Sequence, residues 1–356
     1  MRAMASDYMY WAKTRKPVRF ALGSSEVLPF HLDRLGVDVA GLELDGASYY
    51  RYPPLREAIG RMHGVTAERV VMADGTSMAN MLAMAALLSP GDEVIAEQPV
   101  YGPLVEVASF LGATVRSFAR SSPDFRLDPE AVEAALTPKT RLILLTNLHN
   151  PSGALAHAAT LRAIGALAER VGAYVLIDEV YLYAAKPAQP SAALLGDNFV
   201  CTSSLTKCFG LSGLRCGWIL AEPALAERMW RLNELFGVSQ AHQAERLSCL
   251  ALERLDEVAA ENGDLLARNR ALANAFFACR EEILVAPMVH GITAFPRLLR
   301  GDVDALNDRL RAEYDTSIVP GRFFGLADHF RVGVGKPTEI VEEGLARLGA
   351  ALDALK

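Results

Sequence analysis

From about residue 69 to residue 220, short β-forming apolar runs alternate with amphipathic stretches of helical period. The runs predict seven strands, at residues 69–73, 93–97, 114–118, 141–146, 173–178, 199–203 and 216–220. Helices are expected between them at 77–88, 104–111, 129–136 and 159–171. Apolar strands that alternate with helices predict a mainly parallel sheet covered on both faces, so the expected fold class is α/β.

A second, smaller α+β domain is expected after this sheet. Residues 222–280 are helical in pattern and charged, and β-like runs follow at 283–285, 292–295, 316–319 and 329–334 before a last helix at 337–355. A chain of 356 residues can hold one large core and a satellite domain. We therefore predict a large domain at 41–260 and a small domain formed by 1–40 with 261–356.

Composition and charge argue against several classes of protein. The formal net charge is −6, which gives no electrostatic reason to expect nucleic acid or an anionic membrane as a partner. The five cysteines include no CxxC pair, so neither a disulfide framework nor a metal site is expected. The N-terminal residues lack the apolar run of a signal peptide, and no stretch is long enough to span a bilayer. We expect a soluble, cytoplasmic protein.

Polar residues that directly follow the strands are the candidate site, because ligands of such sheets bind beyond the carboxyl ends of the strands. Ser203-Ser204-Leu205-Thr206-Lys207 ends the sixth strand, and Arg215 lies eight residues after Lys207. A neutral lysine amine can form an imine with an aldehyde cofactor. Ser204 and Arg215 are suited to a phosphate. An ordinary surface lysine on a Gly-rich loop is an equal alternative for this segment alone.

Two more strand ends carry groups that could hold an aromatic ring. Asp178 follows the strand at 173–178, where a carboxylate can hold a protonated pyridine nitrogen, and Tyr181 could donate to a phenolic oxygen. Asn150, in Asn150-Pro151-Ser152-Gly153, can form a hydrogen bond to a ring oxygen. The structural alternatives are a helix N-cap for Asp178 and a plain Asn-Pro turn.

Three further positions are weaker signals. Gly75-Thr76-Ser77 opens a predicted helix, where backbone N–H groups suit a phosphate, although simple N-capping is the alternative. Tyr101 could stack on a flat ring or could be a core residue. Arg331 lies in an otherwise apolar run and needs an anionic partner, which is either a substrate carboxylate or a structural acid.

Taken in order, these residues resemble the class I/II, fold-type I aminotransferases that depend on pyridoxal 5′-phosphate (PLP). The resemblance covers essentially the whole chain, and residues 147–153 and 203–215 are its most specific parts. It implies catalytic roles for Lys207, Asp178 and Tyr181, with Lys207 forming the Schiff base. It implies binding of the substrate carboxylate by Arg331, with Asn150. The cofactor-binding residues that it implies are Gly75, Thr76, Ser77, Tyr101, Asn150, Asp178, Tyr181, Ser204, Lys207 and Arg215.

The resemblance also implies a homodimer, because a tyrosine of the partner reaches the phosphate in this family. Residues 48–56 resemble that region through Leu55-Arg56, but Arg51 stands near the place of the family's usual glycine. The bridging residue is left open among Tyr49, Tyr50 and Tyr52.

The implied reaction moves an amino group between an amino acid and a 2-oxo acid. A Cβ–S lyase, a decarboxylase, or an oxidase or cyclase acting on a basic amino acid would use the same cofactor residues. A non-catalytic sensor with this fold is less favoured, since Lys207 is present. A nucleotide site at Gly75 is disfavoured because neither GxGxxG nor GxxxxGK[ST] occurs there. Candidate contacts to the substrate side chain are Tyr8, Tyr10, Trp11, Glu26 and Arg297, although a structural or surface role is the favoured alternative for each of them.

Overall fold

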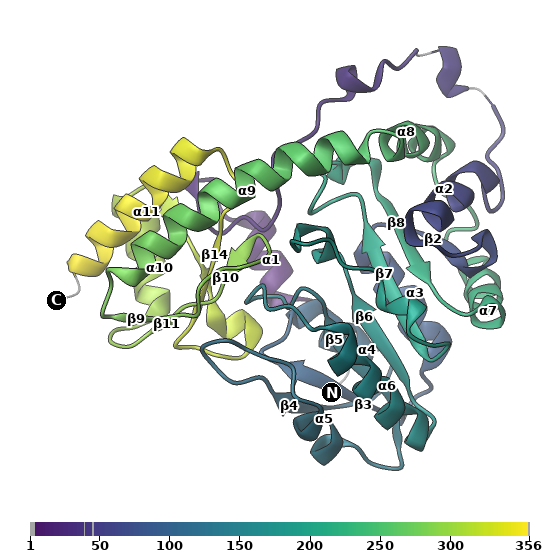
Figure 1. Cartoon of the computed structure of the whole chain (residues 1–356), viewed down its shortest axis with the longest axis horizontal. Coiled ribbons are helices and arrows are strands. Elements are labelled where there is room, and N and C mark those ends of the chain that lie inside the picture. The colour runs from purple at the N-terminus through teal and green to yellow at the C-terminus, as the bar shows by residue number, and fades with distance from the viewer. Residues whose placement is uncertain (1–3, 39, 45, 355–356) are drawn as a thin grey trace.

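The computed structural model describes residues 4–38, 40–44 and 46–354 (Figure 1). Its centre is a seven-stranded sheet of order β2-β8-β7-β6-β5-β3-β4. The strands are β2 (Val70–Asp74), β3 (Glu93–Gln98), β4 (Thr114–Ala119), β5 (Thr140–Thr146), β6 (Tyr174–Asp178), β7 (Phe199–Ser204) and β8 (Cys216–Leu220). Only β8 runs antiparallel to its neighbours β2 and β7, and the other neighbouring pairs are parallel. The predicted α/β fold with a mainly parallel sheet is confirmed.

The sheet is buried between helices, which explains why its inner strands are apolar throughout. Ile143 and Val175 are 0% exposed, as strands covered on both faces require. Helix α3 packs on β2, β7 and β8, and α6 packs on β5 and β6. The helices of this part are α2 (Pro53–His63), α3 (Thr76–Leu87), α4 (Gly102–Phe110), α5 (Pro129–Ala135), α6 (Ala158–Val171), α7 (Pro223–Asn233) and α8 (His242–Leu252).

The long helix α9 (Leu255–Ala278) leads from the sheet to the C-terminal elements (Figure 1). There α9 packs against α11 (Thr338–Asp353), and β14 (Phe330–Gly333) forms an antiparallel sheet with β10 (Thr293–Ala294) and β13 (Val319–Pro320). The remaining elements are β9 (Ile283–Leu284), β11 (Arg297–Leu298), α10 (Val303–Glu313) and β12 (Thr316–Ser317). The predicted domain boundary at residue 260 falls inside α9, and the division into two domains stays a prediction.

The N-terminal segment connects the two parts of the molecule. After α1 (Asp7–Thr14), β1 (Phe20–Ala21) pairs in parallel with β12. The chain then crosses to the loop after β7, where the Val27 amide donates to the Lys207 carbonyl at 3.0 Å and the Phe30 amide donates to the Gly210 carbonyl at 3.1 Å. Residues near the start of the chain therefore lie over the carboxyl ends of the central strands.

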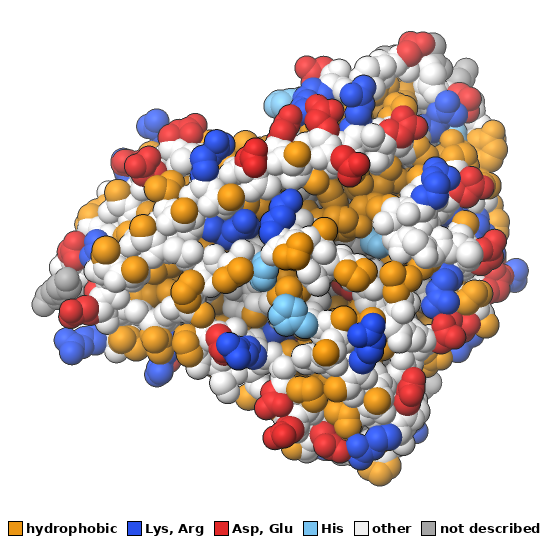
Figure 2. Space-filling model, viewed as in Figure 1, with side chains coloured by type: hydrophobic (Ala, Val, Ile, Leu, Met, Phe, Trp, Pro, Cys, Tyr) orange, Lys and Arg blue, Asp and Glu red, His pale blue; other side chains and the backbone are white. Residues whose placement is uncertain are grey.

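The visible surface carries charges of both signs, with hydrophobic side chains gathered below α8 (Figure 2). Within the described part of the chain, every helix is too short or too polar to cross a bilayer.

Candidate active site

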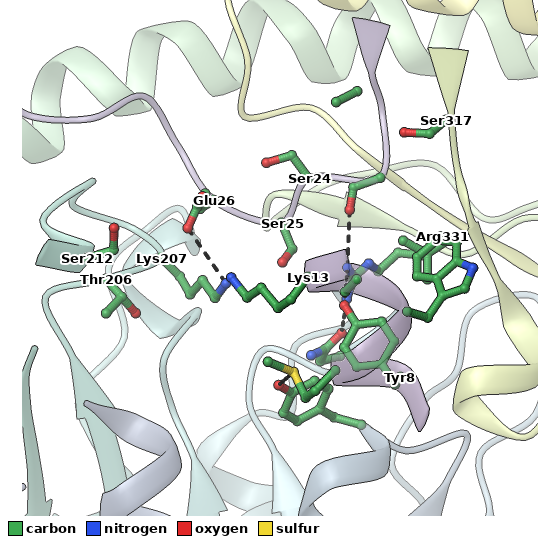
Figure 3. A pocket seen from close by; sticks show the side chains of 18 of the residues that line it. Tyr8, Lys13, Ser24, Ser25, Glu26, Thr206, Lys207, Ser212, Ser317 and Arg331 are labelled. Atoms are coloured by element: carbon green, nitrogen blue, oxygen red, sulfur yellow. Dashed lines mark hydrogen bonds and ion pairs between the residues drawn. The ribbon is translucent and has the colours of Figure 1, made fainter. Parts of the chain in front are cut away.

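A cavity of about 700 Å³ lies beyond the carboxyl ends of the parallel strands, and α1 and residues 17–26 form its other walls (Figure 3). Its lining includes most of the side chains that the sequence singled out, namely Thr76, Ser77, Tyr101, Asn150, Asp178, Tyr181, Lys207, Arg215 and Arg331. Gly75 and Ser204 lie directly behind this lining, since Gly75 faces Arg215 and Ser204 is hydrogen-bonded to Thr76.

Asp178, at the end of β6, is a buried carboxylate with two neutral donors. Its Oδ2 accepts a hydrogen bond from Asn80 Nδ2 at 2.8 Å, and its Oδ1 accepts one from the Val180 amide at 3.0 Å. Burial raises the pKa of Asp178 to about 6, while these donors and the charge of Lys207 act to lower it. Among the described residues, none forms an ion pair with Asp178, so the carboxylate is suited to a cationic ring nitrogen.

Lys207 lies on the loop after β7, and its amine points into the cavity (Figure 3). Its Nζ is 3.8 Å from Glu26 Oε2, on the N-terminal segment opposite. The charge of Lys207 influences the pKa of Asp178, and both side chains line the same cavity. One pyridine ring could therefore lie between the Lys207 amine and the Asp178 carboxylate and contact both groups.

A cluster of hydroxyls and one guanidinium lies at the start of α3. Thr76 Oγ1 donates to Ser204 Oγ at 2.7 Å, and Ser204 Oγ is 2.8 Å from Thr206 Oγ1. Arg215 Nη2 donates to the Asp74 carbonyl at 2.9 Å. Because the first N–H groups of a helix attract anions, this set fits a phosphate.

Gly75 is required at this point for two reasons. Its φ of 81° belongs to the left-handed region, and a Cβ on it would stand 2.3 Å from Arg215 Nη2. The glycine therefore allows the guanidinium to lie against the turn that opens α3.

Arg331, on β14, is a buried guanidinium that contacts only neutral groups. It is 1% exposed. Its Nη1 donates to Asn150 Oδ1 at 3.1 Å, and its Nη2 donates to the Tyr8 hydroxyl at 2.9 Å, whereas its Nε has no partner among the residues that the structure describes. A buried charge without a counter-ion is costly, so the position suits the carboxylate of a ligand.

Two tyrosines complete the wall. Tyr101 precedes α4, and its ring lies edge-on to that of Tyr8 with centroids 5.7 Å apart. Tyr181 is buried beside the end of β6. Burial raises the pKa of both hydroxyls above their usual range, so each stays protonated and able to donate.

The candidate contacts to the substrate side chain divide between the cavity and the surface. Tyr8, Trp11 and Glu26 line the cavity. Tyr10 is 73% exposed, and Arg297 pairs with Asp328 at 2.7 Å. Neither Tyr10 nor Arg297 is part of the cavity wall.

Sequence reasoning overlooked Asn80, whose amide donates to Asp178 while its Oδ1 accepts from Thr202 Oγ1 at 2.6 Å. A signal for it exists, because Asn80 lies four residues after Thr76 and hence on the same face of α3. Thr206 and Ser212, two further hydroxyls of the cavity wall, were not singled out either.

The buried Glu179 predicts a pH-dependent stability. Its Oε1 accepts from the Ala192 amide at 2.8 Å, and burial raises its pKa from 4.5 to about 7. Because the folded protein binds the proton of Glu179 more tightly than the unfolded chain does, protonation of Glu179 stabilises the fold. This stabilisation is complete below pH 4.5 and is lost as the pH rises through 7. In a Glu179→Gln variant this pH-dependent contribution is absent.

We therefore expect the unfolding free energy of the wild type, relative to Glu179→Gln, to fall by about 2–3 kcal/mol between pH 5 and pH 8. Denaturant titrations of both proteins at several pH values measure this difference. Parallel pH profiles would show that Glu179 ionises normally in the folded protein.

Solved structures with this architecture are PLP-dependent enzymes. A PLP-dependent aminotransferase from Streptococcus suis 89-1591 superposes with a TM-score of 0.92 at 23% identity, covering 100% of this chain and 99% of that one. The PLP-dependent cyclase OrfR superposes with a TM-score of 0.88 at 24% identity, covering 99% and 98%. At these identities the likeness shows the fold alone, which is fold type I of the PLP-dependent enzymes.

The sequence identifies the family. Residues 42–348 match the family described as aminotransferase class I and II, and the chain belongs to it. Capreomycidine synthase of Streptomyces vinaceus is 33% identical over 290 residues, which are 80% of this chain and 74% of that protein. Arginine–pyruvate transaminase of Pseudomonas aeruginosa is 29% identical over 318 residues, which are 83% and 79% of the two chains. The family is PLP-dependent.

Proposed function

We propose that this protein is a PLP-dependent aminotransferase, which moves an amino group from an amino acid to a 2-oxo acid. The observation that carries the proposal is the meeting of three groups in one cavity. These are the Lys207 amine, the buried carboxylate of Asp178 and the buried guanidinium of Arg331, which contacts only neutral partners.

The proposal gives the polar groups at the strand ends a part in holding PLP. Asp178 would hold the ring nitrogen, Tyr181 and Asn150 the ring hydroxyl oxygen, and Tyr101 would stack on the ring. The phosphate would lie against residues that share one end of the cavity: Gly75, Thr76, Ser77, Ser204 and Arg215. When bound, PLP supplies an electron sink for the pair of electrons left at the substrate Cα.

The chain's own residues would then carry binding, orientation and proton transfer. Arg331, with Asn150, would hold the substrate carboxylate and so fix the direction of the Cα–H bond. Lys207 would take the proton from Cα as a general base and return it to the cofactor carbon as a general acid. Asp178, kept ionised near neutral pH, would keep the ring nitrogen charged.

A cyclase is the second candidate. It is favoured by the 33% identity to capreomycidine synthase and by the fold shared with the cyclase OrfR. A cyclase would use the same cofactor residues, so only the products separate the two functions.

Product analysis tests the proposal. The protein, supplied with PLP, is mixed with single amino acids and a 2-oxo acid, and all products are identified by mass. We expect one new 2-oxo acid for each new amino acid that forms. When the 2-oxo acid acceptor is left out, the amount of product should not exceed one equivalent of the protein. A cyclised product, ammonia or carbon dioxide formed repeatedly without an acceptor would refute amino transfer.

We also propose a homodimer. Residues 31–38, 40–44 and 46–50 lie along the outside of the molecule (Figure 1), and Leu44, Leu235 and Phe236 are 59%, 77% and 62% exposed. Large exposed apolar side chains favour a protein partner. Tyr50 donates to Glu234 Oε1 of its own chain at 2.6 Å. Tyr49 and Tyr52 pack on His242, and within the described part of the chain neither hydroxyl has such a bond.

A further inference from the structure

The cavity wall carries far more positive than negative side chains. Among the described residues, its acidic members are Glu26 and Asp178 alone. Its basic members are Lys13, Arg15, Lys16, Lys207, Arg215, Arg311, Arg331 and Lys336.

The proposed function uses only part of this charge. Lys207 would join the cofactor, Arg215 would face the phosphate and Arg331 the α-carboxylate, while Asp178 would pair with the ring nitrogen. Glu26 is then the only acid left. The basic residues left over are Lys13, Arg15, Lys16, Arg311 and Lys336.

Most of these remaining cations come from one side of the cavity, formed by α1, the residues after it and α10. Arg311 donates from Nη2 to the Lys16 carbonyl, and its pKa is lowered, first by burial and then by the nearby charge of Arg15. Arg15 is 3.4 Å from Asp308, whose side chain is 70% exposed. Asp308 thus forms an ion pair with Arg15 and acts on Arg311 only through its charge, so an anion entering the cavity would relieve the repulsion between the two guanidinium groups.

Lys13 approaches the reacting centre. It lies in the last turn of α1, and its side chain points across the cavity toward Lys207 (Figure 3). Among the described residues its amine has no hydrogen bond or ion pair, and it lines the same wall as Arg331. A substrate held at Arg331 would therefore extend into a space that Lys13 enters.

An aromatic ring supports the cations on this side of the cavity. The Trp11 ring lies 4.8 Å beneath the Arg15 guanidinium and lines the same wall. Cations favour an anion and repel a guanidinium or an ammonium.

Glu26 does not reverse this balance. Its Oε2 is 3.8 Å from Lys207 Nζ, and Lys13 points toward the same place from α1 (Figure 3). A single carboxylate can offset only one of these two amines, and the cations of the wall still outnumber its acids.

We infer that the cations of α1, residues 15–16 and Arg311 form a second anion subsite, so that the substrate is an amino acid with a side-chain carboxylate. The inference rests on the proposed function, which assigns the α-carboxylate to Arg331. It runs against a basic substrate such as the one named for the arginine–pyruvate transaminase.

Three acids that have no amine able to condense with PLP test the charge of the subsite without turnover. Valerate, glutarate and 4-(trimethylammonio)butyrate share one carboxylate and differ at the far end, which is a methyl, a carboxylate or a quaternary ammonium. Calorimetry with the PLP-loaded protein should show glutarate binding at least about tenfold more tightly than valerate, with the quaternary ammonium acid weakest. Equal binding of glutarate and valerate, or tighter binding of the quaternary ammonium acid, would overturn the inferred substrate class.

Variants assign the effect to the subsite. Lys13→Gln combined with Arg311→Gln should remove most of the glutarate advantage and leave valerate binding unchanged, which also shows that the variant is folded. Lys139→Gln, an exposed lysine outside the cavity, is the matched control. A glutarate advantage that survives in the double variant would overturn the assignment to α1 and Arg311. If glutarate is preferred but no amino acid is transaminated, the proposed function fails and the charge preference stands.

Discussion

A Lys207→Ala variant is expected to lose at least about a thousandfold in turnover, because the side chain that moves the proton at Cα is removed. The same variant should lack the yellow absorbance of PLP joined to the protein, and borohydride should no longer fix PLP to the chain. Stopped-time product assays and absorbance spectra of wild type and variant measure both effects.

The control for this prediction is Lys139→Ala, which changes an exposed lysine outside the cavity. We expect the control to keep both the absorbance and the activity. A Lys207→Ala protein that retains covalently reducible PLP would mean that another amine reacts, and Lys13 would be the first to examine because it points toward Lys207 (Figure 3).

An Asp178→Asn variant is expected to lose about a hundredfold in turnover and to bind PLP more weakly. A buried, charge-assisted hydrogen bond contributes roughly 1.5–3 kcal/mol, and an amide in its place cannot hold the ring nitrogen in its charged form. Turnover at saturating substrate and equilibrium dialysis of PLP measure the two losses separately.

The same carboxylate makes the affinity for PLP depend on pH. Burial raises the pKa of Asp178 to about 6 in the protein without cofactor, so the proton that it gains below that pH removes its negative charge. Wild-type affinity for PLP should therefore fall as the pH drops from 7 to 5, whereas that of Asp178→Asn should not. The same fall in the variant would assign the acid dependence to another group. In the PLP-loaded protein Asp178 should become protonated only at lower pH, since an adjacent cation lowers the pKa of a carboxylate.

The order of the strands and the polar residues after them could be predicted because both are local properties of the chain. The strand at 173–178, for example, is continuously apolar and ends in Asp178, and β6 spans Tyr174–Asp178 in the structure. Parallel strands place their carboxyl ends at one edge, so the meeting of Asn150, Asp178 and Lys207 at one cavity follows from the pattern.

The N-terminal contacts could not be predicted in this way. Tyr8 reaches Arg331 across 323 positions of sequence, and Phe20 pairs with Thr316 in a strand of two residues. A two-residue strand has no periodicity to detect, and its pairing depends on the packing of both parts of the chain. The approach of Glu26 to Lys207 follows from the same crossing of the N-terminal segment.

By itself the sequence determined the α/β sheet, the edge of that sheet at which chemistry can occur and the residue types present there. The spacing of apolar residues and the positions at which strands end depend on residues that are neighbours in the chain, so both can be recognised from the sequence. Only the tertiary structure decided what surrounds them. It set Asn80 against Asp178, left Arg331 without a counter-ion among the described residues and brought Lys13, Arg15 and Lys16 to the cavity wall. These features depend on distances between segments far apart in the chain, and burial and electrostatic interaction are functions of those distances.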